Sequence, residues 1–178
     1  MKKHNRKKIR LPLVEYEQEG LYFVTTCVHN GECVFGNVMD GEMHLNGYGR
    51  CVEQQLLWLS KQYSYVNIDT YTIMPNHVHG IIGINRIDIW GVGTGRDLSL
   101  HTIKPLPELI GAFKTTSSKQ IHKMGLLKFR WQRSFFDRII RNEQELQDIR
   151  EYIINNPMNW HLDRNNPEAL ETMKFWRI

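Results

Sequence analysis

The ten residues from Met74 to Gly83 constrain the fold of this chain more than any other stretch. They read Met-Pro-Asn-His-Val-His-Gly-Ile-Ile-Gly, an apolar run interrupted by two histidines. In an extended strand alternate side chains share a face, so His77 and His79 point the same way while Val78 points into the core. Two imidazoles side by side on a rigid strand can supply two ligands to one divalent metal ion. Such a pair also occurs as ordinary polar or core histidines, so it indicates chemistry only when other groups join it.

The 178 residues are long enough for one domain with a sizeable core. No apolar run reaches the ~20 residues needed to cross a bilayer, and the N-terminal apolar stretch is too short for a signal peptide. The three cysteines show no CxxC spacing and indicate a reducing compartment. We therefore expect a cytoplasmic protein with no membrane partner. It forms a single domain over 1–178, with a basic N-terminal arm at 1–19 and a C-terminal tail at 159–178.

The basic residues are concentrated in two regions. Six of the 23 lie within residues 1–10, and the other 17 are outnumbered by 19 acidic residues. A second region, from Lys104 to Arg141, holds nine basic residues against Glu108 and Asp137. Clustered positive charge is typical of proteins that bind a polyanion, although a solvated surface has the same composition.

Hydrophobic periodicity predicts the secondary structure. Strands are expected at 21–29, 66–74, 77–84 and 129–140, a hairpin within 31–45, and helices at 46–62, at 107–124 and from Asn142 to the stop at Pro157. Glu145 lies three residues after Asn142, as in a capping box. This order predicts an α+β fold, a ferredoxin-like antiparallel sheet with helices packed on one face.

The last helix carries two polar groups that complete a reactive set. Tyr152 lies at the edge of its apolar stripe, and Asn156 lies one turn later on the same side. If this edge faces the histidine strand, Asn156 can complete a metal site for Mg2+ or Mn2+ with His77 and His79. The Tyr152 hydroxyl could then attack a DNA phosphodiester and form a covalent phosphotyrosine. Each residue alone has a structural explanation, and their joint occurrence favours the functional one.

At these residues the chain resembles a known group of enzymes. Asn76-His77-Val78-His79 is similar to the signature of the HUH endonuclease superfamily, in which two histidines flank a bulky apolar residue. The blocks 74–79, 131–140 and 152–157 resemble the single-tyrosine transposases, and most of all the branch associated with repetitive extragenic palindromes. The opening Arg10-Leu11 and the segment 20–26 are also similar to that branch. The resemblance covers roughly residues 9–160.

This resemblance implies a ferredoxin-like sheet with the histidines on a central strand. It implies an enzyme that cuts single-stranded DNA near an imperfect hairpin, binds the 5′ phosphate to a tyrosine and leaves a free 3′-OH. His77 and His79 would be metal ligands, Tyr152 the nucleophile and Asn156 the third ligand, a position that is often glutamine in insertion-sequence relatives. The partners would be single-stranded or hairpin DNA, and the protein a monomer or homodimer.

Phosphate contacts by the basic regions would hold the hairpin, mostly without reading its sequence. The candidate DNA-binding residues are Lys7, Lys8, Arg10, Lys114, Lys119, Lys123, Arg133 and Arg138. Trp131, Phe135 and Phe136 could stack on unpaired bases, but core packing is the favoured interpretation. The tail from Asn159 either docks over the active cleft or packs against the body.

Three other functions fit the same residues. The first is a DNA- or RNA-binding repressor with the same fold and a relic site. The second is a replication-initiator nickase of the same superfamily, which the shortness of the chain disfavours. The third is a metal phosphodiesterase that uses activated water, in which Tyr152→Phe would leave cleavage intact.

Overall fold

The computed structural model describes residues 19–85 and 103–169. Three of the candidate DNA-binding residues, Lys7, Lys8 and Arg10, lie outside these ranges, as do residues 170–178 of the predicted tail. Among the described residues, no helix combines the length and apolarity needed to cross a membrane.

Four strands form one antiparallel sheet. They are β1 (Gly20–Cys27), β4 (Val66–Ile73), β5 (His77–Ile84) and β6 (Phe136–Ile140), in the order β4-β5-β1-β6. Strand β5 is buried along its whole length because it lies inside the sheet and is covered on both faces. With the helices that connect these strands, this is the split βαβ arrangement of the ferredoxin-like fold. The predicted α+β class and the central position of the histidine strand are confirmed.

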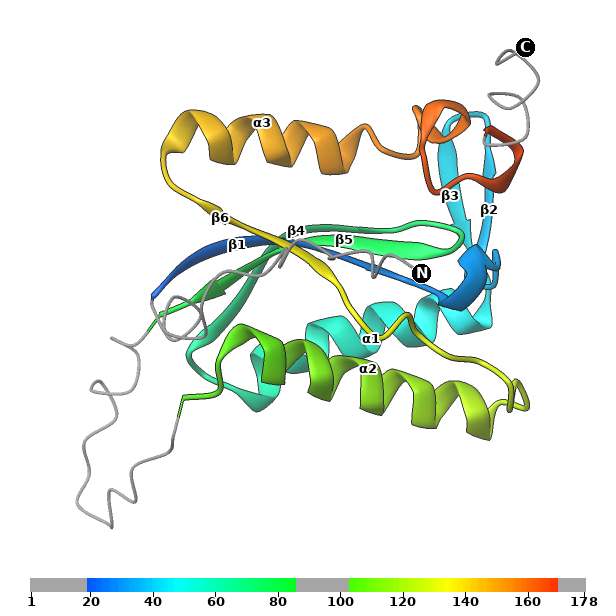
Figure 1. Ribbon diagram of the computed structural model, residues 1–178, viewed down its shortest axis with the longest axis horizontal. Coiled ribbons are helices and arrows are strands. Elements are labelled where there is room, and N and C mark those ends of the chain that lie inside the picture. The colour runs from blue at the N-terminus through cyan, green and yellow to red at the C-terminus, as the bar shows by residue number, and fades with distance from the viewer. Residues whose placement is uncertain (1–18, 86–102, 170–178) are drawn as a thin grey trace, which may run out of the picture.

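The helices lie on both sides of the sheet (Figure 1). Helices α1 (Gly47–Gln62) and α2 (Leu106–Lys123) cover one face, and α3 (Glu143–Ile154) lies over the other. The expectation of helices on a single face therefore holds for α1 and α2, which belong to the βαββαβ core. Helix α3 follows the last strand and crosses to the opposite face, where it brings Tyr152 to the histidine side.

The two faces of the sheet bury cores of different size. The larger core lies under α1 and α2 and includes Val78, Phe113 and Trp131. The smaller one lies under α3 and consists of Ile81, Ile140, Leu146 and Ile153 with partly buried neighbours. The two histidines at the beginning of β5 are buried but do not belong to either apolar core.

A two-stranded hairpin is inserted between β1 and α1. Its strands are β2 (Gly36–Met39) and β3 (Glu42–Leu45), joined at Asp40-Gly41, where both residues have positive φ angles of 52° and 79°. Positive φ at both central positions is the geometry that favours an Asp-Gly turn in a hairpin. Asn46 then caps α1 by accepting bonds from the amides of Tyr48 and Gly49.

The last strand is shorter than predicted. The sequence pattern places it at 129–140, but β6 occupies only Phe136–Ile140, preceded by a single bridge between Val28 and Trp131. Trp131 is buried in the main core and donates its indole N–H to Ser117 of α2. The aromatic residues that made 129–135 look like a strand therefore anchor a loop to α2. The end of α3 is also earlier than expected, at Ile154, and two short 3-10 helices lie at His29–Gly31 and Trp160–Leu162.

Candidate active site

His77 and His79 project together from β5 toward the α3 side of the sheet. The alternation of the strand directs Val78 into the main core and leaves both imidazoles on the opposite face. Both residues are almost completely buried, and their Nε2 atoms are 3.0 Å apart. The sequence prediction that they share one face is correct.

A hydrogen-bond network fixes the orientation of His77. The Asn76 amide nitrogen donates to the backbone carbonyls of Gly31 and Asn165, so its side-chain oxygen is left to accept from Nδ1–H of His77 at 2.8 Å. With its proton on Nδ1, His77 presents the Nε2 lone pair to the site. An outer partner that fixes the tautomer in this way is typical of metal-binding histidines.

His79 is oriented by the neighbouring strand. Thr25 lies opposite it in the β1–β5 register, and its hydroxyl is 2.8 Å from Nδ1 of His79. Burial lowers the pKa of both histidines to about 3, and at His79 the neighbouring His77 adds to this while Asp163 opposes it. Both imidazoles are therefore neutral near pH 7, which is the form that binds metal ions.

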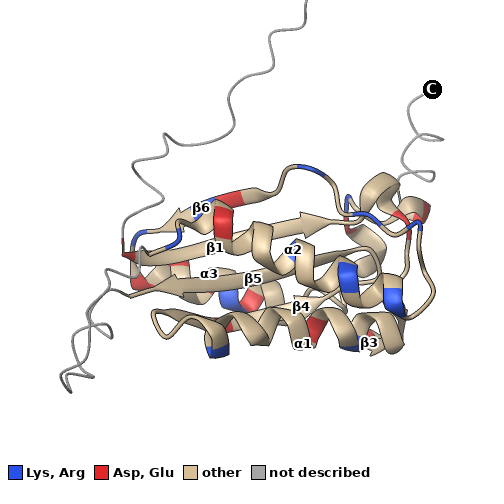
Figure 2. Cartoon of the chain, turned by 90° about the horizontal axis from the view of Figure 1, so that it is seen from below, with Lys and Arg blue, Asp and Glu red and all other residues tan. Residues whose placement is uncertain are grey.

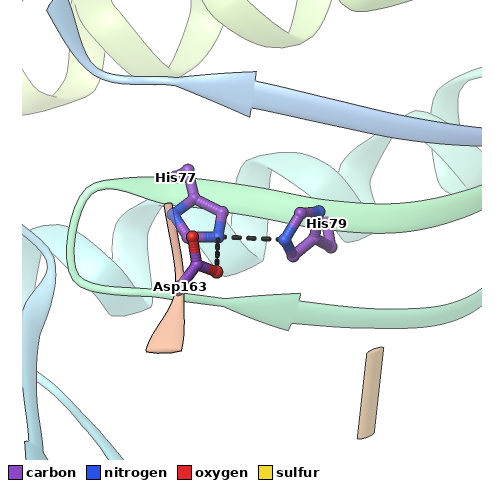
Figure 3. Close-up of side chains that lie close together, drawn as sticks. All are labelled: His77, His79 and Asp163. Atoms are coloured by element: carbon purple, nitrogen blue, oxygen red, sulfur yellow. Dashed lines mark hydrogen bonds and ion pairs between the residues drawn. The ribbon is translucent and has the colours of Figure 1, made fainter. Parts of the chain in front are cut away.

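Asp163 completes a group of three potential ligands (Figure 3). Its carboxylate comes from the segment after the 3-10 helix at Trp160–Leu162, and its Oδ2 is 3.7 Å from Nε2 of His77. The ligand atoms of His77, His79 and Asp163 all lie within 4.8 Å of one another. Since His77 is neutral, this contact is not an ion pair, and a cation at this point would satisfy the carboxylate. The sequence did not predict Asp163 as a site residue. It predicted only that the tail from Asn159, which contains Asp163, could dock over the cleft.

The tail segment packs against the histidines through further contacts. The ring of Trp160 lies 6.0 Å from that of His77, and the Asn165 carbonyl accepts from Asn76. The sequence left open whether the tail docks over the active cleft or packs against the body. The described part of the tail docks at the cleft.

Tyr152 reaches the same site from α3. Its hydroxyl is 3.4 Å from Nε2 of His79, and the residue is 49% exposed, so an incoming substrate can contact it. Burial of one side of the ring raises the pKa of Tyr152 above its ordinary value of 10, and Asp163 raises it further. A hydrogen bond from the Asn156 side chain and the positive charge of Arg164 act in the opposite direction. The hydroxyl is thus protonated at neutral pH.

Asn156 lies in the turn that follows α3 and is 4% exposed. Its side-chain oxygen is buried and has no hydrogen-bond partner among the described residues. An unpaired buried amide oxygen is costly unless a ligand satisfies it. The role of Asn156 as a metal ligand stays a prediction, and the group of three potential ligands is completed by Asp163.

These residues fit a divalent metal ion. Nitrogen ligands bind such ions at about 2.1 Å, so two that bind one ion at right angles lie about 3 Å apart, as the two Nε2 atoms do. The donors gathered here are two neutral imidazoles and one carboxylate. Nitrogen and oxygen donors of this kind suit Mg2+, Mn2+ and related ions.

Phe23 joins the reactive groups and was not predicted as a site residue. Its ring stacks on His79 with a centroid distance of 5.6 Å and an interplanar angle of 24°, and it meets Tyr152 edge-on at 5.9 Å. The alternation of β1 places it on the histidine face, beside Thr25.

The candidate DNA-binding residues are divided between the two faces. Lys119 and Lys123 are exposed on α2, on the face opposite the histidines, and Arg133 is exposed in the loop that follows. Figure 2, a view onto the helical face, shows basic positions along α2 and in this loop. A groove between them is lined by Lys119, Arg130 and Arg133 among others.

Two of the candidate residues make contacts within the protein. The Lys114 ammonium donates to the backbone carbonyls of Gln132 and Ser134, so it holds the loop in place. Arg138 lies on the histidine face of β6, is 64% exposed and pairs with Glu145 at 2.6 Å.

No family model matches the chain. An uncharacterized protein of Haemophilus influenzae is 35% identical over 171 residues, which cover 90% of this chain and 93% of that protein. Among solved structures, a REP-associated tyrosine transposase bound to a REP hairpin aligns with a TM-score of 0.55 at 16% identity, over 92% of this chain and 77% of that one. The chain therefore shares the fold of this REP-associated tyrosine transposase, in agreement with the fold that the sequence resemblance implied.

Proposed function

This chain belongs to the same family as the uncharacterized Haemophilus influenzae protein, and we propose that it is a metal-dependent transposase or nickase that cleaves and rejoins single-stranded DNA at hairpins. It acts as a single domain over residues 1–178. The observation that carries this proposal is the Tyr152 hydroxyl, which lies 3.4 Å from Nε2 of His79 inside a group of three potential metal ligands.

The reaction is a transesterification. The Tyr152 oxygen attacks the scissile phosphorus and forms a phosphotyrosine bond, while the bond from phosphorus to the 3′ oxygen breaks. The phenolic proton is replaced by the DNA 5′ phosphate, and the leaving 3′ oxygen gains a proton to become a free 3′-OH. Because the phosphodiester energy is kept in the tyrosine link, the reverse reaction can join this phosphate to another 3′ end.

His77, His79 and Asp163 would hold the metal ion, with the unpaired oxygen of Asn156 as a further ligand. A bound divalent ion would withdraw charge from a phosphate oxygen. The exposed guanidinium of Arg164, whose charge is felt at Tyr152, would attract the same phosphate. Asn76 and Thr25 keep the two imidazoles in position for this chemistry.

The DNA partner is supported by the basic surface and by the bound REP hairpin in the structural neighbour. We assign the phosphate contacts to Lys119, Lys123 and Arg133 on the helical face, with Lys7, Lys8 and Arg10 of the N-terminal arm. Arg138 would contact DNA near the nucleophile. Lys114 would act indirectly, because its ammonium holds the loop at 132–134.

A covalent-adduct assay tests this function. The full chain is mixed with Mn2+ or Mg2+ and a labelled single-stranded oligonucleotide that carries the palindromes beside its own gene. We expect a protein–DNA band that resists SDS and requires the metal ion. Tyr152→Phe removes only the nucleophilic oxygen and should abolish the band.

Tyr63→Phe is the matched control, since Tyr63 undergoes the same chemical change next to the main core. Its band should equal that of the wild type. Hairpin binding without a band under any metal would favour the binding-only alternative. Cleavage that survives Tyr152→Phe would assign the reaction to an activated water molecule.

A further inference from the structure

Phe136 is an exposed aromatic residue on the face that carries the nucleophile. It begins the edge strand β6, pairs with Thr25 of β1 and is 47% exposed. Thr25 in turn bonds His79. Phe136 therefore lies on the sheet surface next to the residue that positions one of the histidines.

Phe23 connects Phe136 to the reactive groups. The Phe23 and Phe136 rings meet at 6.1 Å with an interplanar angle of 67°, and Phe23 also contacts His79 and Tyr152. These rings form a continuous aromatic surface from the edge of the sheet to the nucleophile. We call Phe23 and Phe136 the aromatic pair.

The other two aromatic residues considered for stacking are occupied within the protein. Trp131 is buried in the main core with its N–H bonded to Ser117, and Phe135 is half-buried beneath the Lys114 ammonium. Of the three, Phe136 alone is about half exposed, so the interpretation as core packing is correct for Trp131 and Phe135 but not for Phe136.

The charges around the aromatic pair favour a nucleotide over an apolar partner. Arg138 lies two residues along β6 on the same face and is 64% exposed, and the exposed Arg164 acts on Tyr152. An exposed ring on a face that also carries exposed guanidinium groups suits a base whose flanking phosphates carry negative charge. Arg138 already pairs with Glu145, but most of its side chain stays exposed and can approach a phosphate, a group that a purely apolar partner does not offer.

We propose that the aromatic pair binds one unpaired nucleobase next to the scissile phosphate, by stacking on Phe136. The substrate at this point is single-stranded DNA, since a base inside a duplex has both faces covered by the neighbouring base pairs. This inference rests on the proposed function, because it places the base beside the phosphate that Tyr152 attacks.

The test is a binding experiment in which the base and the ring are removed separately and together. The full chain, without metal, is titrated with the same hairpin oligonucleotide, in which each unpaired position near the cut is replaced in turn by an abasic site. We expect one position at which the wild type binds roughly 5- to 150-fold more weakly, the range for loss of one base–aromatic stack. Phe136→Ala should weaken binding of the intact oligonucleotide by a similar factor. The Phe136→Ala variant should bind the abasic oligonucleotide as tightly as it binds the intact oligonucleotide.

Phe136→Trp supplies another stacking surface, so this variant should still bind the abasic oligonucleotide more weakly than the intact one. Leu127→Ala removes a more exposed apolar side chain in the turn after α2, on the other face, and should leave binding unchanged. An abasic penalty that is equal in wild type and Phe136→Ala would overturn the inference. The inference would also be overturned if no abasic position weakened binding by the wild type. The same holds if Phe136→Ala changed only the oligomeric state, measured by light scattering.

The outcomes also separate this inference from the proposed function. A wild-type covalent band together with an unchanged abasic penalty in Phe136→Ala would refute only the base site. Coupled abasic and Phe136→Ala effects without any covalent band would support the base site and refute the chemistry. No binding of single-stranded DNA would overturn both.

Discussion

At the scale of single residues, Asn156 and Asp163 are the two oxygen-bearing candidates for the third ligand of a metal ion. The Asn156 oxygen is buried without a hydrogen bond, and the Asp163 carboxylate lies beside a neutral imidazole. A divalent ion held by the two histidines would satisfy the Asp163 carboxylate. The sequence suggested Asn156 as the third ligand, and the structure adds Asp163 as a candidate of equal standing.

Asp163→Asn separates the two candidates because it removes one charge with almost no change in shape. We expect Mn2+ affinity, measured by calorimetry on the full chain, to weaken at least about tenfold. Tenfold is the smaller loss of metal affinity that is typical when a group supporting the ligands is mutated. Asp148→Asn, an exposed carboxylate on α3, should bind Mn2+ as the wild type does. Unchanged Mn2+ affinity in Asp163→Asn would exclude this carboxylate as a ligand and leave the role to Asn156.

A second prediction at this scale concerns Asn76. Asn76→Ala removes the acceptor that holds the proton of His77 on Nδ1, so Mn2+ affinity should fall by about 10- to 100-fold although no ligand is lost. The same calorimetric titration measures it, and circular dichroism verifies that the variant is folded. Full Mn2+ affinity in a folded Asn76→Ala would show that the tautomer does not need this partner.

At the scale of secondary-structure elements, the position of α3 decides whether Tyr152 reaches the histidines. Arg150 of α3 forms two hydrogen bonds with the Asp69 carboxylate of β4, at 2.8 and 2.5 Å. Asp69 lies where the β4–β5 register shifts, between Ile68 and Tyr71. Such irregularities redirect side chains, and here the carboxylate meets a helix two residues away from the nucleophile. The ion pair therefore fixes α3 against the sheet at the level of Tyr152.

The Asp69–Arg150 pair predicts a specific dependence of stability on pH. The hydrogen bond from Arg150 is the main cause that lowers the pKa of Asp69 below its ordinary value of 3.8. A carboxyl whose pKa is lower in the folded state stabilises the fold above the unfolded pKa, and this contribution is lost as the pH falls through the folded pKa. Urea unfolding at several pH values should therefore show wild type more stable than Asp69→Asn at pH 7, with the difference lost as the pH falls below the ordinary value of 3.8 and through the lower pKa of the folded state.

Asp148→Asn again supplies the comparison, since this carboxylate bonds only to Gln144 in the described structure and forms no ion pair there. Its stability difference from wild type should be small at every pH. A difference between wild type and Asp69→Asn that persists unchanged into acid would mean that Asp69 acts through packing or hydrogen bonding alone.

At the scale of the whole molecule, the sheet separates the nucleophile from much of the positive charge. Tyr152 and the histidines lie on the α3 face, whereas Lys119 and Lys123 lie on α2, on the other face. A hairpin that contacts both must pass around an edge of the sheet. Strand β6 is the edge that carries Phe136 and Arg138, and the loop before it carries Arg133.

This division predicts that binding and cleavage respond differently to mutation. The double variant Lys119→Ala, Lys123→Ala should weaken hairpin binding and reduce the slope of log affinity against log salt by about one for each lysine that had bound a phosphate. At saturating DNA its covalent band should form as in the wild type. Lys61→Ala, an exposed lysine at the end of α1, is the control. An unchanged salt slope in the double variant would remove α2 from the DNA-binding surface.

The local features of this chain were predictable because their causes are local. Alternation directs His77 and His79 to one face and Val78 to the other, and Asn142 caps α3 by accepting from the Glu145 amide. The prediction of strand structure failed at 129–135, where aromatic residues that suit a strand pack against α2 instead. Propensity does not distinguish a buried loop from a strand when the contacts that bury it come from a distant helix.

The sequence by itself determined the α+β class, the paired histidines and the candidates Tyr152 and Asn156, since each follows from a period of two or 3.6 residues or from a motif. Only the tertiary structure decided that α3 crosses to the histidine face, that Asp163 and Phe23 join the site and that Asp69 pairs with Arg150. Asp69 and Arg150 are 81 residues apart, and Asn76 and Asn165 are 89 apart. No short-range pattern records such contacts, because they form only when the sheet is assembled and its two faces are covered.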